Sequence, residues 1–264
     1  MESPSATIPI LANLLHLAWF GRLQKLARSP IYRLWWRGWR DCETILAGHL
    51  RGDRFPAPVI AARLGIAHLP LQRWLLERLR PGETVYLSQD PLGLLSLLAA
   101  RRVGTQGRVY GVVSRPRDLP RLAELRAANQ LENLHFLPVE VARQAAAPAS
   151  PGAPSCWAPP QVSLDSLALV LPPPDLIYLA LGETHLRGSS PPTPAPPADS
   201  MREEGILAGA ERLLSTRPPH TWIVESSSKE EAARVAPRLA VAGYQVSSPP
   251  WPAPLLAFRP LPRP

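Results

Sequence analysis

The pattern of hydrophobic and polar positions between residues 82 and 139 is the clearest structural signal in this chain. Short apolar runs, which predict buried strands, alternate with longer segments whose apolar residues recur at helical spacing. Because strands that alternate with helices usually pair in parallel, the segment predicts half of a nucleotide-binding sheet with right-handed crossovers. The predicted order is strand Thr84–Leu87, helix Leu92–Arg101, strand Arg108–Val113, helix Leu119–Asn129 and strand Leu134–Val139.

The same alternation resumes after a gap rich in proline and alanine at residues 144–160. A proline-rich insertion at about residues 184–202 interrupts it, and because proline fixes φ and lacks an N–H donor, this insertion cannot pack as a helix or an interior strand. Residues 1–80 show helical spacing throughout, which predicts an N-terminal helical cap before an α/β domain at residues 81–264. The further predicted elements are strand Leu176–Leu181, helix Glu203–Ser215, strand Thr221–Glu225, helix Lys229–Ala242 and a terminal hairpin at Tyr244–Val246 and Leu255–Phe258.

Composition describes a globular protein with a strong excess of arginine. The hydrophobic fraction is 45% and the net charge is +8, and all of the 29 cationic residues except Lys25 and Lys229 are arginine. Arginine that is abundant together with alanine, proline and leucine is typical of GC-rich coding, so we attribute most of the basicity to that bias. An anionic partner is the alternative explanation.

Cysteines and apolar runs indicate the compartment. Cys42 and Cys156 are isolated and fit neither a metal site nor a disulfide framework, which favours a reducing environment. The apolar run at Ile8–Phe20 is too short to span a bilayer and has no basic segment before it, as a signal peptide would have. We therefore expect a cytoplasmic protein without a metal site.

Residues 19–40 (WFGRLQKLARSPIYRLWWRGWR) combine four of the eight tryptophans with six cations and no acid. The composition is compatible with packing of the cap onto the sheet, with a helix on an anionic membrane surface, or with nucleic acid binding. Pro30 interrupts any single long helix and favours packing of the cap. Peripheral membrane contact is the second reading, and nucleic acid is the least favoured.

Four segments in order resemble a class I S-adenosylmethionine-dependent methyltransferase, specifically the FkbM type. They are RPGETVYLSQDPLGLLSLLAA, GRVYGVVSRPRDLPRLAELRAANQLENLHFLPVEV, VSLDSL followed by PDLIYLALG, and EEGILAGAERLL followed by WIVES. The resemblance implies a Rossmann-like sandwich with a mostly parallel sheet and a C-terminal antiparallel hairpin. It also implies S-adenosylmethionine as cofactor, and a small molecule or glycan whose hydroxyl accepts the methyl group.

The cofactor motifs depart from the family pattern. The loop that resembles D-V-G-A-N-x-G falls on residues 87–93, where Gln89 takes the place of a glycine and only Gly93 is kept. If the loop keeps its path, Gln89 adopts a left-handed conformation at a cost of about 1–2 kcal/mol. The acid that in the family holds the ribose hydroxyls is Val113 here. The alternative to an active enzyme is therefore a methyltransferase fold kept as a binding or scaffold module.

The remaining polar residues at the ends of the predicted strands are the candidate site. Asp90 and Ser114 also suit ordinary turns, and Glu225, which ends an apolar strand, is better placed to line the ligand crevice. Glu183 follows the fourth predicted strand one position later than the family's acid. We predict Ser88, Asp90, Gly93, Ser114 and Glu140 as cofactor-binding residues and Glu183 and Glu225 as catalytic residues.

Overall fold

The computed structural model describes residues 44–56, 59–142, 159–180, 206–225, 229–247 and 255–258. Contacts divide the chain into residues 1–43 and residues 44–264, and every described residue belongs to the second unit. The predictions for residues 19–40, for the insertion at about 184–202 and for Glu183 therefore lie outside the described residues.

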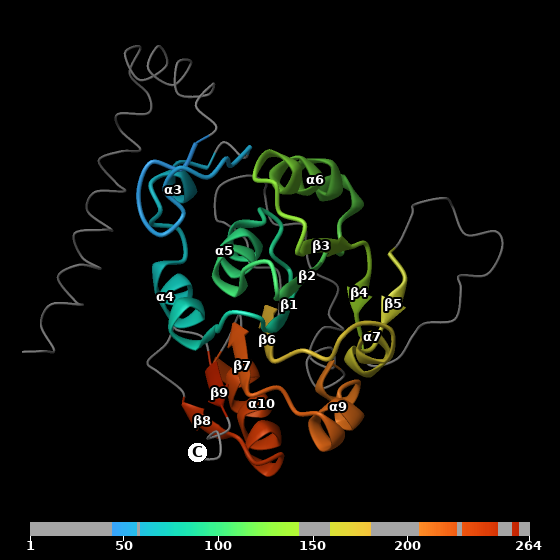
Figure 1. Ribbon diagram of the computed structural model, residues 1–264. Helices are drawn as coiled ribbons and strands as arrows, with labels where there is room; N and C mark the ends of the chain where they lie inside the picture. Colours follow the sequence, from blue (N-terminus) through green and yellow to red (C-terminus); the bar gives the residue numbers. More distant parts are fainter. Residues whose placement is uncertain are drawn as a thin grey trace, which may run out of the picture. The chain divides into compact units, whose positions relative to one another are not determined.

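A seven-stranded sheet forms the centre of the domain, in the order β3-β2-β1-β6-β7-β9-β8 (Figure 1). β1, β2, β3, β6 and β7 run parallel, and β9 pairs antiparallel with both β7 and β8. This arrangement confirms the predicted class I methyltransferase sheet with its antiparallel C-terminal hairpin. The strands are β1 (Thr84–Ser88), β2 (Arg108–Val112), β3 (Leu134–Leu137), β6 (Leu176–Ala180), β7 (Thr221–Glu225), β8 (Gln245–Ser247) and β9 (Leu255–Phe258).

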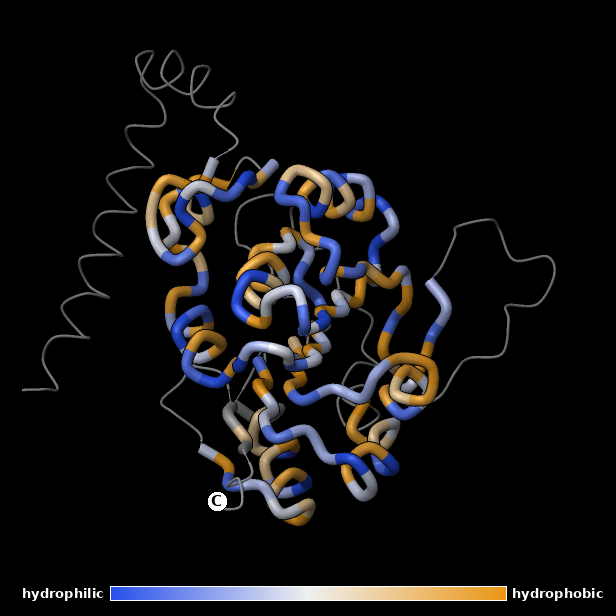
Figure 2. The backbone as a smooth tube through the Cα atoms, viewed as in Figure 1, coloured by the Kyte–Doolittle hydropathy of each residue, from blue (hydrophilic) through white to orange (hydrophobic). Residues whose placement is uncertain are grey.

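Helices cover both faces of the sheet because side chains alternate along each strand. Val85 and Leu87 face a core shared with α3 (Ile60–Arg63), α4 (Leu69–Arg78), α5 (Leu94–Val103) and α6 (Leu119–Ala128). Tyr86 faces a second core shared with α7 (Leu164–Val170), α9 (Glu211–Thr216) and α10 (Lys229–Val241). In Figure 2, α5 carries a long hydrophobic stretch, whereas α6 mixes hydrophobic and hydrophilic residues. Eight of the ten α5 residues are buried, against two in α6.

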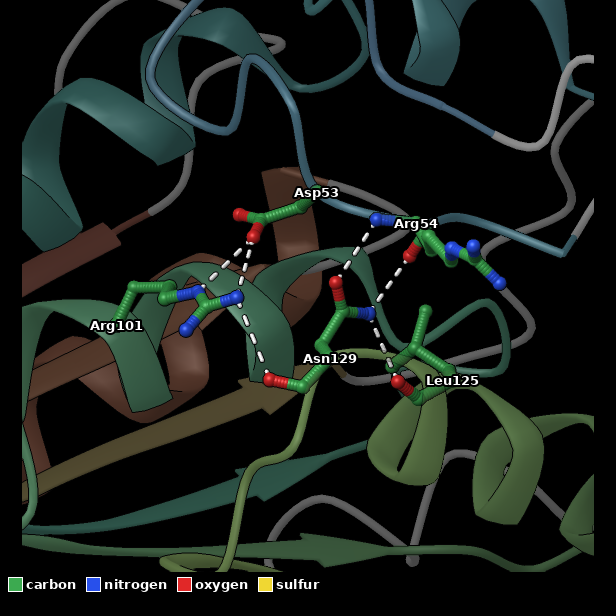
Figure 3. A network of polar contacts seen from close by, with 5 residues as sticks. All are labelled: Asp53, Arg54, Arg101, Leu125 and Asn129. Carbon is green, nitrogen blue, oxygen red and sulfur yellow. Dashed lines mark hydrogen bonds and ion pairs between the residues drawn. The ribbon is translucent and has the colours of Figure 1, made fainter.

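Residues 44–56 and 59–79 pack onto the same core as the sheet. Ile45, Phe55 and Leu75 are each at most 1% exposed and belong to the cluster that contains β1 and α5. Figure 3 shows that Asn129, just after α6, forms hydrogen bonds with the backbone of Arg54. Its amide accepts from the Arg54 N–H at 2.8 Å and donates to the Arg54 carbonyl at 2.7 Å. The boundary predicted at residue 80 stays a prediction.

The structure departs from the predicted elements in three places. Within the predicted helical cap, residues 44–54 form turns and an antiparallel bridge between Thr44 and Arg54. The helix predicted at Glu203–Ser215 is interrupted, because residues 206–208 are helical and α9 begins again at Glu211. Asp165, in the first turn of α7, causes the restart: its carboxylate accepts from the N–H groups of Arg212 at 2.9 Å and Leu213 at 2.7 Å. A second small parallel sheet, β4 (Glu140–Val141) with β5 (Gln161–Val162), was not predicted.

Among the described residues, none of the helices combines the length and the apolar character that crossing a bilayer requires.

Candidate functional site

The carboxyl ends of the parallel strands define the candidate site. From β1 the chain proceeds outward through β2 to β3, and the sheet then continues on the other side of β1 through β6 and β7. The strand order therefore reverses between β1 and β6. Open α/β sheets bind ligands in the crevice beyond the carboxyl ends of the strands at such a switch point.

The loop after β1 keeps the backbone path that a glycine would favour. Gln89 has φ of 59°, and it is one of three residues other than glycine with positive φ in the described part of the chain. This confirms the left-handed conformation predicted for Gln89 if the loop kept its path. The strain of about 1–2 kcal/mol is offset by the contacts that hold the loop. One of them is a hydrogen bond from the Arg121 guanidinium to the Pro91 carbonyl.

Asp90 closes the amino end of α5 with its own carboxylate. Oδ1 accepts from the Gly93 N–H at 3.1 Å, and Oδ2 accepts from the Ser96 N–H at 2.7 Å. Burial raises the pKa of Asp90, whereas the hydrogen bonds from Ser96 and Gly93 and the charge of His68 oppose that rise. The first amides of a helix attract anions, and here the anion belongs to the chain itself.

Gly93 allows the start of α5 to pack closely against α6. Its φ is 77°, and a Cβ atom at this position would lie 2.7 Å from Leu122 Cδ2 and 3.0 Å from Leu125 Cδ2. Both leucines belong to α6, so a side chain at residue 93 would displace the ends of these two side chains. Ser88, another predicted cofactor ligand, is the buried last residue of β1 with 6% exposure. The structure thus gives Gly93 a packing role and holds Ser88 within the sheet.

Tyr178 and Glu225 form a polar pair that sequence reasoning missed. The Tyr178 hydroxyl donates to Glu225 Oε2 at 2.6 Å. Ala180 of β6 is in register with Glu225 of β7, which places Tyr178 and Glu225 diagonally on one face of the sheet. Burial raises the pKa of Tyr178 well above its ordinary value, and the nearby charges of Glu225 and Asp90 raise it further. A known strand register would have been the signal for this pair.

A small cavity lies between the loop after β1 and Tyr178. Its volume is about 20 Å³, and its polar lining residues are His68, Gln89, Asp90 and Tyr178. That volume holds roughly one water molecule. His68 has φ of 53°, so two left-handed residues line the same cavity. Strained residues of this kind cluster at functional sites. A larger cavity of about 450 Å³ lies along α6 and shares none of these lining residues.

The end of β2 is apolar where the family resemblance places an acid. Val113 is 5% exposed, and its N–H donates to the Leu137 carbonyl at 2.9 Å, so the ladder to β3 continues through this residue. Ser114 follows in the turn and is half-buried. Arg115 is half-buried and Arg117 is exposed. Polar groups at this strand end are therefore a hydroxyl and guanidinium groups rather than a carboxylate.

The structure brings some of the predicted site residues together. Asp90 and Tyr178 line the same small cavity, and the Tyr178 hydroxyl donates to Glu225 Oε2, so both predicted acids lie close to Tyr178. Glu140 lies in the separate sheet of β4 and β5, where its N–H donates to the Pro160 carbonyl at 3.0 Å. Within the described ranges, no group of three or more side chains of the types that bind metals is present.

The chain matches no family model and no curated protein, so its membership of the FkbM family stays a prediction. Its fold is similar to solved methyltransferase structures. Precorrin-6Y C5,15-methyltransferase from Geobacter metallireducens GS-15 is 14% identical with a TM-score of 0.44, over 74% of this chain and 91% of that one. A putative rRNA methylase from Clostridium thermocellum is 12% identical with a TM-score of 0.46, over 71% and 91%. The fold assignment rests on the strand order of the central sheet.

Proposed function

We propose that this chain is a class I methyltransferase fold used as a binding module, which does not transfer a methyl group from S-adenosylmethionine. The observation that carries the proposal is the position of the Asp90 carboxylate on the Gly93 and Ser96 amides. They are two of the amides at the amino end of α5 that would attract an anion, and both already donate to the Asp90 carboxylate.

The chemistry of the other strand end supports the same conclusion. In the family that the sequence resembles, an acid at the end of the second strand holds both ribose hydroxyls. Val113 offers no acceptor there, and charge-assisted hydrogen bonds are worth about 1.5–3 kcal/mol each. Loss of two such bonds corresponds to a binding constant weaker by about a hundredfold or more. The apolar side chain of Val113 at this strand end supports the proposal that the cofactor is not held in its usual place.

A second candidate function is the methyl transfer that the resemblance implies, to a hydroxyl of a sugar or secondary metabolite. Gln89 favours it, because the loop accepts backbone strain to keep the path of the family's glycine. Glu225 would then be the acid nearest to a reacting hydroxyl at the end of β7, with Tyr178 orienting its carboxylate.

Calorimetric titration with S-adenosylmethionine and S-adenosylhomocysteine separates the two candidates. For the binding module we expect no heat up to millimolar ligand, from protein whose circular dichroism and cooperative urea unfolding establish that it is folded. Micromolar binding would contradict the proposal and favour the enzyme. A large side chain at Ser114 tests the location of any binding, because Ser114 is half-buried in the turn after β2. Gly93 is unsuitable for that purpose, since any side chain there disturbs the packing of α6.

A further inference from the structure

The cavity along α6 lies apart from the candidate site and has the size of a small-molecule pocket. Its volume is about 450 Å³, within the range of about 300–1,000 Å³ that is usual for ligand pockets. Its lining comes from α6, from the turn that follows α6 and from β3, which is at one edge of the sheet and lies next to α6 in Figure 1. It shares no lining residue with the small cavity beside Tyr178, so it is a separate candidate for ligand binding.

One part of this lining is apolar and held in place. Leu119, Ala123 and Ala127 follow one another at intervals of four residues, so they lie along one face of α6. The Phe136 ring joins them from β3. That ring packs directly on β2 because residue 111 is glycine: a Cβ atom at Gly111 would lie 2.8 Å from Phe136 Cδ1. The cavity thus offers a fixed apolar surface with short alanine side chains opposite an aromatic ring.

Two side chains of opposite charge line the same cavity. Arg126 Nε donates to the Leu131 carbonyl at 3.1 Å, which anchors the guanidinium beside the turn and leaves its terminal nitrogens for other partners. Glu132 supplies a carboxylate. In the described part of the chain, Arg126 and Glu132 form no ion pair with each other. Opposite charges that line one cavity without pairing suit a ligand that carries both charges itself.

The turn after α6 keeps a long side chain where glycine is favoured. Gln130 has φ of 54°, and its N–H donates to the Ala127 carbonyl at 3.1 Å, so it is the left-handed residue that ends the helix. Such a conformation costs a residue other than glycine about 1–2 kcal/mol. Gln130 lines the cavity, where its amide adds a donor and an acceptor to the two charged groups.

We propose that the cavity along α6 binds a free α-amino acid with a large apolar side chain. Arg126 and the Gln130 amide donate to the carboxylate, Glu132 accepts from the ammonium group, and the side chain lies against Phe136. A ligand with only one of the two charges would meet a like charge in the cavity, whereas a zwitterion pairs with both. The proposal goes beyond the proposed function and does not rest on it, because the residues involved are different.

Calorimetry at low ionic strength, where exposed charges are least screened, tests the site with a matched set of ligands. L-phenylalanine carries both charges, 3-phenylpropanoate lacks the ammonium group, phenethylamine lacks the carboxylate, and L-alanine lacks the ring. We expect L-phenylalanine to bind at least about 5-fold tighter than either ligand with a single charge. It should bind about 10-fold tighter than L-alanine, because its ring covers apolar surface.

Variants of the two charged residues assign each group of the ligand. Glu132→Gln should weaken L-phenylalanine and phenethylamine about 5-fold and leave 3-phenylpropanoate at least as tight. Arg126→Gln should weaken L-phenylalanine and 3-phenylpropanoate instead. Glu124→Gln is the matched control, since Glu124 is an exposed glutamate of the same helix that does not line the cavity, and it should change no affinity. Cooperative urea unfolding establishes that each variant is folded.

Three outcomes would overturn the site. They are an absence of heat from L-phenylalanine at millimolar concentration, equal affinity for L-phenylalanine and 3-phenylpropanoate, and equal effects of Glu132→Gln and Glu124→Gln. S-adenosylmethionine also carries an amino acid group, so its titration is repeated with Glu132→Gln. Heat that this variant keeps belongs to the crevice and bears on the proposed function, whereas heat that it loses belongs to the cavity along α6.

Discussion

The Asp90 cap can be tested through the stability of the protein. Asp90→Ala removes the acceptor of two amide hydrogen bonds at 3.1 and 2.7 Å. Bonds to a charged acceptor are worth about 1.5–3 kcal/mol each, which gives a gross loss of roughly 3–6 kcal/mol. The substitution also removes the cost of burying a carboxylate, which offsets part of the lost hydrogen-bond energy. Removal of a helix cap typically costs about 0.5–2 kcal/mol. We therefore expect the free energy of unfolding to fall by about 2 kcal/mol at pH 7.

Urea denaturation followed by far-ultraviolet circular dichroism measures this change directly. The midpoint should fall while the slope stays constant, because the surface exposed on unfolding hardly changes. The same loss corresponds to a melting temperature lower by about 4–8 °C for a chain of this size. A loss below about 0.5 kcal/mol, the usual range of neutral surface substitutions, would refute the capping role.

The pH dependence gives an independent check of Asp90. Burial raises its pKa above the ordinary value of 3.8, so the folded state binds this proton more tightly than the unfolded state. Its contribution to stability is then fully present below that ordinary value and declines as pH rises through the raised pKa. The stability gap between wild type and Asp90→Ala should therefore be larger at pH 4 than at pH 7. Asp90→Asn is the matched control, since its side chain does not titrate, and a gap that widens with pH would contradict the reasoning.

Three further predictions concern other parts of the described structure. Gly93→Ala should destabilise more than Gly82→Ala: both glycines have positive φ, but only at Gly93 would a Cβ approach Leu122, at 2.7 Å, so equal melting temperatures would argue against the contact. Asn129→Ala should lower the free energy of unfolding by about 2–3 kcal/mol in urea, because the buried amide bonds three backbone groups, and a loss under 1 kcal/mol would count against it. Tyr178→Phe should lower the free energy of unfolding by about 1–2 kcal/mol, because it removes the hydrogen bond to Glu225. The raised pKa keeps Tyr178 protonated at high pH, so ultraviolet titration near pH 11 should detect the same number of tyrosinates in the folded variant as in wild type.

The local pattern of hydrophobic and polar residues predicted most of the helices and strands. The strand at Thr221–Glu225 has the predicted bounds, and α5 and α6 begin and end within two residues of the prediction. Alternation and helical spacing are imposed by burial of one face or both faces of an element, so they are visible in the chain itself. The helix at Glu203–Ser215 was the exception, since its interruption depends on a carboxylate more than forty residues away.

The sequence by itself determined the order of elements, which follows from the pattern of hydrophobic and polar residues. Its resemblance to the methyltransferase family indicated the missing acid at Val113, and a left-handed Gln89 on the condition that the loop kept its path. Only the tertiary structure decided that Asp90 is enclosed and that Gly93 is covered by α6. It also decided that Tyr178 donates a hydrogen bond at 2.6 Å to Glu225, which lies 47 positions further along the chain. Such contacts depend on strand order and register, which are set by the packing of the whole sheet. The scaffold could thus be predicted from the chain, and the chemistry of its crevice required the fold.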